Sequence, residues 1–206
     1  MIFYAISDRS LAPGGDLLHQ ASGLLRAGID WLQIREKDLP DGALFQVSKA
    51  LVPESRRFGA LLLVNGRADI AAAAGASGVH LPSSGLPTPD VRRLFPPPFV
   101  IVRSCHSEAE VVQAQEEGAD AAVFGPVYPT PSKAPYGPAL GVDRLREACG
   151  RVRMPVLALG GVSRERLGEV LAAGAAGAAA IRLFCSMANP LAELPALRAS
   201  LAGVEQ

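Results

Sequence analysis

The chain has 206 residues, of which 49% are apolar and 19% charged. That apolar content excludes an intrinsically disordered chain, and the length suits one α/β barrel domain over residues 1–206. The 20 basic and 20 acidic residues balance, so no net charge draws the chain to nucleic acid or to an anionic membrane.

The chain shows no membrane-crossing or secretory pattern. No apolar run reaches the roughly 18–20 residues of a membrane span, and the first residues lack a secretory signal. Cys105, Cys149 and Cys185 are odd in number and show neither zinc nor disulfide spacing. We therefore expect a cytoplasmic protein with reduced thiols and with no nucleic-acid or membrane partner.

Short apolar runs alternate with segments of helical periodicity along the whole chain. Strands are predicted at residues 3–7, 31–35, 61–65, 78–81, 99–104, 121–125, 156–160 and 178–181. Helices are predicted at residues 14–27, 41–58, 68–74, 88–94, 107–117, 142–150, 164–173 and 190–201. Eight strands alternating with eight helices predict a parallel (β/α)8 TIM barrel.

A weak internal repeat supports the barrel. Gly28, Gly75, Gly118 and Gly174 each follow a predicted helix and precede an even-numbered strand, which gives four βαβα units. The rival fold, an open doubly wound sheet, would need a glycine-rich dinucleotide motif after the first strand. Residues 8–14 contain no such spacing, so the closed barrel is favoured.

Polar residues at the carboxyl ends of barrel strands face the active site in this fold. Gln33, Arg35 and Lys37 alternate onto one face after the second strand, which suits a polar heterocycle and a phosphate. Asn65 ends the third strand and Ser104 the fifth, and both are candidate ligand contacts. The histidines His80 and His106 are expected to pack in the core or to anchor loops.

The segment from Gly125 to Lys133 and the glycine pair after the seventh strand predict a phosphate site. Two hydroxyls and a lysine lie within four residues of a proline-rich loop, and a Gly-Gly backbone can approach an anion closely. Arg182, after the eighth strand, either adds charge there or points to solvent. The predicted phosphate contacts are Thr130, Ser132, Lys133, Gly160, Gly161 and Arg182.

Several motifs in order resemble the thiamine phosphate synthase/TenI family over nearly the whole chain. They are residues 4–8 (YAISD), 33–38 (QIREKD), 78–81 (GVHL), 125–133 and 159–162 (LGGV). The resemblance implies a (β/α)8 barrel that handles thiazole phosphate in thiamine biosynthesis, often as a homodimer. It assigns Gln33, Asn65 and Ser104 to the pyrimidine, and Arg35, Lys37 and Lys133 to its pyrophosphate. The resemblance also implies a thiazole phosphate site at Thr130, Ser132, Gly161, Ile181 and Arg182.

Two positions depart from the synthase pattern. In the synthase an Asp follows the third-strand Asn and another follows the fourth-strand His-Leu, and both support Mg²⁺. Here Gly66 and the segment 81–85 (LPSSG) stand there without a carboxylate, and Mg²⁺ prefers carboxylate oxygens. The sequence therefore favours the TenI branch: a metal-independent thiazole tautomerase that moves a proton on carboxythiazole phosphate and needs no cofactor.

The proton carrier of that reaction is unassigned. Tautomerases of the family carry a His where this chain has Pro126, which leaves Lys133, His80, His106 and Cys105 as weak candidates. One alternative is a thiamine phosphate synthase with other Mg²⁺ ligands, such as Asp69 or Glu36. Another is a non-catalytic thiazole-phosphate-binding regulator.

Overall fold

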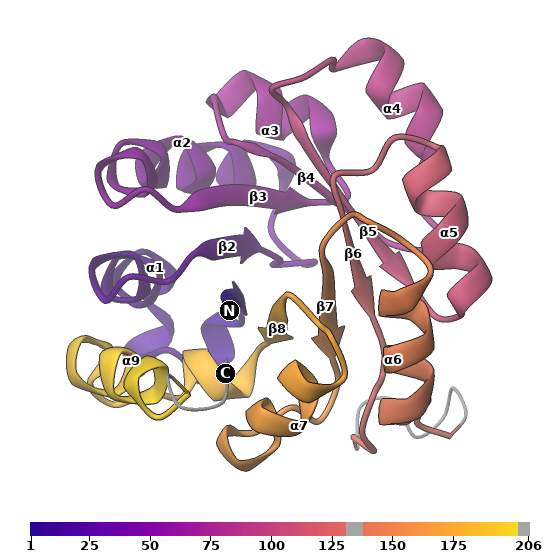
Figure 1. Ribbon diagram of the computed structural model, residues 1–206. Helices are drawn as coiled ribbons and strands as arrows, with labels where there is room; N and C mark the ends of the chain where they lie inside the picture. The colour runs from indigo at the N-terminus through magenta and orange to yellow at the C-terminus, as the bar shows by residue number, and fades with distance from the viewer. Residues whose placement is uncertain (131–137, 202–206) are drawn as a thin grey trace.

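Eight parallel strands close into a barrel in the computed structural model, which describes residues 1–130 and 138–201. Each strand pairs with its sequence neighbours, and β8 pairs with β1 (Figure 1). The strands are β1 (Ile2–Ile6), β2 (Trp31–Ile34), β3 (Leu61–Asn65), β4 (Gly78–Leu81), β5 (Val100–Cys105), β6 (Ala121–Phe124), β7 (Val156–Leu159) and β8 (Gly177–Ala180). The predicted (β/α)8 barrel is confirmed.

Helices surround the barrel, and most of them connect successive strands, whereas α8 and α9 follow β8 (Figure 1). They are α1 (Leu17–Arg26), α2 (Asp41–Arg57), α3 (Ala68–Ala74), α4 (Thr88–Leu94), α5 (Glu108–Glu116), α6 (Val142–Gly150), α7 (Leu167–Ala172), α8 (Arg182–Cys185) and α9 (Pro190–Ala199). Each lies within a segment predicted to be helical, except the four-residue α8. No helix in the described ranges has the length and apolarity needed to cross a membrane.

The first helix begins three residues later than the periodicity predicts. Gly14 and Gly15 have positive φ angles in a short 3-10 turn, and the Asp16 side chain then accepts a hydrogen bond from His19 N–H. That side-chain cap satisfies a free backbone donor at the start of α1, so the helix begins at Leu17.

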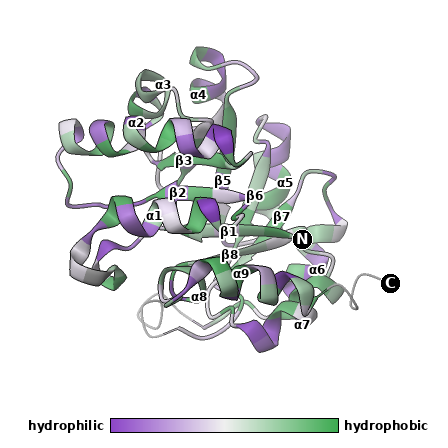
Figure 2. Cartoon of the chain, turned by 90° about the vertical axis from the view of Figure 1, so that its left-hand side faces the viewer, coloured by the Kyte–Doolittle hydropathy of each residue, from purple (hydrophilic) through white to green (hydrophobic). Residues whose placement is uncertain are grey.

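The core has two layers that follow from strand alternation. One set of side chains fills the barrel interior and includes Tyr4, Leu63, Val102 and Leu157. The other set packs outward between the strands and the helices. Apolar colouring is concentrated along the strands, whereas the helices carry hydrophilic stretches as well (Figure 2). Polar residues on inward positions near the carboxyl ends of the strands therefore meet at the opening of the barrel on that side, here called the mouth.

The repeat predicted from the glycines has a structural role. In three of the four units, the residue two positions after the glycine accepts a hydrogen bond from a backbone N–H of the preceding strand. The pairs are Asp30 with Phe3 (2.7 Å), Ser77 with Leu62 (3.0 Å) and Asp120 with Ile101 (2.7 Å). The fourth unit has Ala176 at this position, which has no side-chain acceptor.

We expect Asp120→Ala to destabilise the barrel by about 1.5 kcal/mol, because it removes a charged hydrogen-bond acceptor from Ile101 N–H. It also removes the ion pair with Arg92. The matched control Asp143→Ala removes only an exposed pair with Arg146 one helical turn away, and should cost about 0.5 kcal/mol or less. Urea unfolding checks both, and equal losses would contradict the role assigned to Asp120.

Candidate active site at the carboxyl ends of the strands

A buried polar chain crosses the barrel interior just below the mouth. Gln33 Nε2 donates to the Tyr4 hydroxyl at 2.8 Å, and that hydroxyl lies 2.9 Å from His80 Nδ1. The other ring nitrogen of His80 lies 2.7 Å from Ser104 Oγ. The structure therefore brings two residues predicted from the pyrimidine assignment, Gln33 and Ser104, into one network with Tyr4 and His80.

The loop after β2 is fixed by a second network. Ser7 Oγ accepts a hydrogen bond from Arg35 N–H at 2.9 Å and donates to Glu36 Oε1 at 2.6 Å. Glu36 is only 8% exposed, and its other oxygen accepts from Arg9 N–H at 3.4 Å. These contacts hold the backbone from which the Arg35 and Lys37 side chains extend.

A cleft of about 270 Å³, here called the cationic cleft, lies beside the ends of β2 and β3. Its lining includes the predicted residues Arg35, Lys37 and Asn65, together with Gly66 and Arg67. Arg35 and Asn65 are half-buried, whereas Lys37 is exposed. Two carboxylates, Glu36 and Asp41, also line it, but Glu36 is bound by Ser7 and Asp41 by Arg67. The cleft therefore offers cationic donors and one amide to a ligand.

Arg67 was not predicted as a site residue, although its position two residues after Asn65 is a usable signal. Its guanidinium holds Asp69 with two hydrogen bonds of 3.0 and 2.7 Å, and also contacts Asp41. These contacts raise the Arg67 pKa above its usual value, and the hydrogen bonds from Arg67 lower the pKa of Asp69. The donors of Arg67 are thus engaged with two carboxylates.

The residues at the mouth do not fit a Mg²⁺ site. Gly66 and the exposed Ser83 and Ser84 occupy the positions where the synthase pattern has carboxylates. Asp69 is bound by Arg67, and Glu36 is bound by Ser7. Across residues 1–130 and 138–201, no group of three or more His, Cys, Asp and Glu side chains is arranged to hold a metal ion.

The glycine pair after β7 packs against the segment after β6. A Cβ on Gly160 would lie 2.6 Å from Pro126 Cβ, and one on Gly161 would lie 2.7 Å from Tyr128 Cβ. Both glycines have positive φ angles, 95° and 64°. Tyr128 N–H also donates to Gly160 O at 2.9 Å. Only glycine therefore allows the two loops to lie this close.

A surface cluster holds the same two loops from outside. The Tyr128 hydroxyl donates to Glu169 at 2.6 Å, and the Arg166 guanidinium lies 4.4 Å from the Tyr128 ring centroid. Arg166 also donates to Gly161 O at 2.6 Å. These contacts position the chain that leads into Thr130, which is half-buried.

The remaining predicted phosphate contacts are placed unevenly. Ile181 is half-buried after β8, and Arg182 is exposed as the first residue of the short α8. Ser132 and Lys133 lie outside the described residues. A phosphate contact at any of these four positions stays a prediction.

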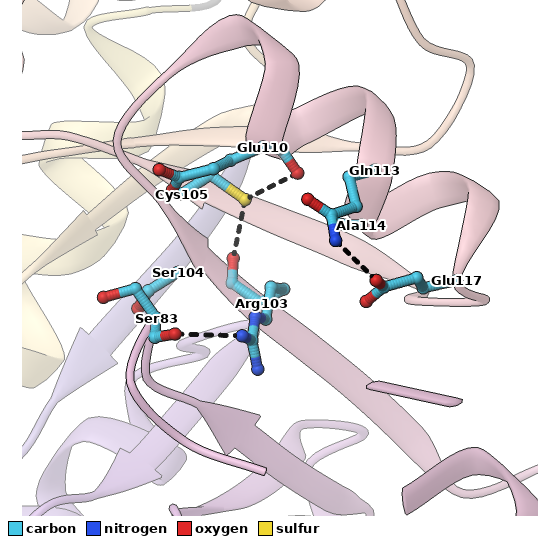
Figure 3. A pocket seen from close by; sticks show the side chains of 8 residues that line it. All are labelled: Ser83, Arg103, Ser104, Cys105, Glu110, Gln113, Ala114 and Glu117. Carbon is cyan, nitrogen blue, oxygen red and sulfur yellow. Dashed lines mark hydrogen bonds between the residues drawn. The ribbon is translucent and has the colours of Figure 1, made fainter. Parts of the chain in front are cut away.

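Cys105, a weak proton-carrier candidate, faces away from the barrel interior. Its Sγ lies 3.5 Å from Glu110 O, in a pocket of about 300 Å³ beside α5 (Figure 3). Burial raises the pKa of this thiol to about 12. A thiol with that pKa is a poor proton donor or nucleophile near pH 7.

The two histidine candidates have structural partners. His80 is 3% exposed, and burial, reinforced by Arg35 and Arg103, lowers its pKa to about 3. His106 Nδ1 contacts Gly125 O, and its backbone N–H donates to Glu110 Oε2 at 2.7 Å. His106 therefore anchors the loop after β5 to β6.

Comparison with known proteins agrees with this fold. The family model described as thiamine monophosphate synthase matches residues 3–184. A relative in Geobacter sulfurreducens is 45% identical and covers 96% of this chain and 93% of its own. The thiamine-phosphate synthase of Chlorobium luteolum is 38% identical over 92% of this chain and 87% of its own. 

A solved structure is also similar to this chain. The thiamine phosphate pyrophosphorylase from Pyrococcus furiosus is 29% identical, with a TM-score of 0.88 over 100% of this chain and 97% of that one. The match of the family model to most of the chain, and relatives well above 30% identity, identify the family. The chain belongs to the thiamine phosphate synthase/TenI family.

Proposed function

We propose that this chain is a thiamine-phosphate synthase, which joins hydroxymethylpyrimidine diphosphate to thiazole phosphate and releases pyrophosphate. The observation that carries the proposal is the cationic cleft at the ends of β2 and β3. Relatives named as this enzyme, which align with nearly the whole chain, support it. The names of these relatives give no support to the tautomerase expected from the sequence, so the synthase is now the leading proposal.

In the proposed reaction, the carbon–oxygen bond to the diphosphate breaks and the thiazole nitrogen bonds to the freed methylene carbon. Negative charge develops on the departing diphosphate, and fixed cationic donors stabilise such charge strongly. Arg35 and Lys37 are the cations of the cleft that remain available, because Arg67 is engaged with Asp41 and Asp69. No step is assigned to a metal ion, since the carboxylates at the mouth are already bound.

We assign the pyrimidine to the inner part of the mouth. Asn65 and Ser104 are half-buried at the strand ends and can reach a ring. Gln33 is 1% exposed and donates to Tyr4, so it contributes to the pyrimidine site mainly from below the mouth. An amide and a hydroxyl offer both donors and acceptors to a heterocycle.

We assign the thiazole phosphate to the ends of β6, β7 and β8. The packing of Gly160 and Gly161 against Pro126, Tyr128 and Pro129, the residues that lead into Thr130, supports this assignment. Backbone groups after the seventh and eighth strands are the common phosphate site of this fold. The proposed contacts are Thr130, Ser132, Lys133, Gly160, Gly161, Ile181 and Arg182.

A second candidate function is the metal-independent thiazole tautomerase. The absence of carboxylates at Gly66, Ser83 and Ser84 favours it, because a proton shift on an anchored phosphate ester needs no metal. This activity would retain the phosphate site and dispense with the diphosphate grip of Arg35 and Lys37.

One set of assays separates the two functions. Purified protein is incubated with both synthase substrates, in Mg²⁺ and in EDTA, and pyrophosphate and thiamine phosphate are measured. We expect pyrophosphate and thiamine phosphate to form in equal amounts. In a separate incubation with carboxythiazole phosphate, ultraviolet absorbance should show no aromatisation. The reverse result would replace the synthase by the tautomerase.

A third outcome would point away from catalysis. Tight binding of thiazole phosphate without turnover in either assay would identify a non-catalytic binding protein. The proposed partners are the small-molecule substrates, and the homodimer and the cytoplasmic location expected from the sequence stay predictions.

A further inference from the structure

The buried polar chain below the mouth links four different strands, β1, β2, β4 and β5. Tyr4 is fully buried, and Gln33 and His80 are 1% and 3% exposed, whereas Ser104 is half-buried at the end of β5. The three contacts between them measure 2.8, 2.9 and 2.7 Å. The chain therefore runs from the dry interior of the barrel to the site where we place the pyrimidine.

The donors and acceptors of this chain fix its direction. Gln33 Nε2 can only donate, so the Tyr4 oxygen accepts there and its single hydrogen is left for His80 Nδ1. That ring nitrogen must then carry no proton. Because burial and the charges of Arg35 and Arg103 keep the His80 pKa far below neutral, the ring holds one proton, on Nε2.

The same direction of hydrogen-bond donation extends to Ser104. A protonated Nε2 donates to Ser104 Oγ across the 2.7 Å contact, so the hydroxyl hydrogen of Ser104 cannot point at His80. Ser104 is half-buried at the mouth, and this hydrogen is left to point away from the interior.

We infer that Tyr4 and His80 are positioning residues that hold Ser104 as a hydrogen-bond donor, so that the ligand atom facing Ser104 is an unprotonated ring nitrogen. The inference rests on the proposed function for the identity of the ring. A fixed donor of this kind discriminates against a ring that presents N–H or C–H at the same place, because the half-buried Ser104 hydroxyl would then have no hydrogen-bond acceptor in the ligand. It also makes His80 a poor proton carrier, since both ring nitrogens are engaged.

The tautomer of His80 can be read directly in the ligand-free protein. Nitrogen-15 NMR at pH 7 should show His80 with Nε2 protonated and Nδ1 unprotonated, with His80→Gln used to assign its signals among the three histidines. Tyr4→Phe removes the hydrogen that Nδ1 accepts, and should yield a mixture of tautomers. A ring protonated on Nδ1, as a reversed Gln33 amide would produce, or on both nitrogens, would overturn the inference.

A double-mutant cycle tests whether Tyr4 acts through Ser104. The affinity for hydroxymethylpyrimidine diphosphate is measured by calorimetry in EDTA for four proteins: unmodified, Tyr4→Phe, Ser104→Ala and the double variant. We expect Tyr4→Phe to weaken binding about three- to ten-fold when Ser104 is present, and less than about two-fold when it is absent. Equal weakening in both backgrounds would mean a merely structural role and would overturn the inference.

The control is Ser48→Ala, which removes a buried hydroxyl from α2 and should leave the affinity unchanged. If the unmodified protein fails to bind the diphosphate, the proposed function fails. The NMR result still decides the direction of the hydrogen-bond chain, so the two failures are distinguishable.

Discussion

Arg35→Ala should lower the rate of pyrophosphate release by about 10²–10³-fold, as the loss of one fixed donor to developing charge does in other enzymes. Arg35 is half-buried in the cationic cleft, and its backbone N–H is held by Ser7 Oγ at 2.9 Å. In the proposed mechanism the Arg35 guanidinium, carried on this fixed backbone, stabilises the charge of the leaving diphosphate. Lys37 is exposed, so Lys37→Ala should have a smaller effect.

Steady-state kinetics with both substrates measures the effect, and the loss should appear in kcat more than in KM. Arg26→Ala is the matched control, because it removes an exposed arginine at the end of α1, remote from the strand carboxyl ends, where it pairs with Glu54. Its rate should equal that of the unmodified protein. Equal rates for Arg35→Ala and Arg26→Ala would remove the cleft from the proposed mechanism.

Gly160→Ala should destabilise the protein by about 2–4 kcal/mol, the sum of a strained left-handed backbone and an overpacked contact. The new Cβ would lie 2.6 Å from Pro126 Cβ and 2.7 Å from its Cα, so the segment after β6 must shift. Because that segment leads into Thr130, the affinity for thiazole phosphate should fall as well. Urea unfolding and calorimetry measure the two effects.

Gly168→Ala is a matched control for that substitution. Gly168 lies inside α7, its added Cβ would meet no atom within 4 Å, and its φ angle is not positive. An alanine there should stabilise the helix by about 0.5–1 kcal/mol and leave phosphate affinity unchanged. If the two variants behaved alike, the close packing of the two loops would not be what requires glycine at position 160.

The fold was predictable because the barrel is built from repeated local signals. Buried strands are continuous apolar runs, and the glycines that end alternate helices mark the repeat. Periodicity could not find α8, since four residues from Arg182 to Cys185 make too short a window. Nor could it place the start of α1, which a single side-chain cap at Asp16 determines.

For the candidate site, the sequence could predict only which strand ends carry polar groups. The rule for barrel strands points to Gln33, Asn65 and Ser104, which the structure places at or just below the mouth. The link from Tyr4 to His80 spans 76 positions, and no spacing rule connects residues so distant in sequence. The pairing of Arg67 with Asp41 spans 26 positions and likewise depends on tertiary geometry.

The repeat unit that ends in Ala176 has a consequence for local opening of the barrel strands. The other three quarters each gain a side-chain clamp on a strand amide, whereas this quarter, between β7 and β8, lacks that clamp. Local opening at the amino ends of the strands should therefore be easier in this quarter than in the other three.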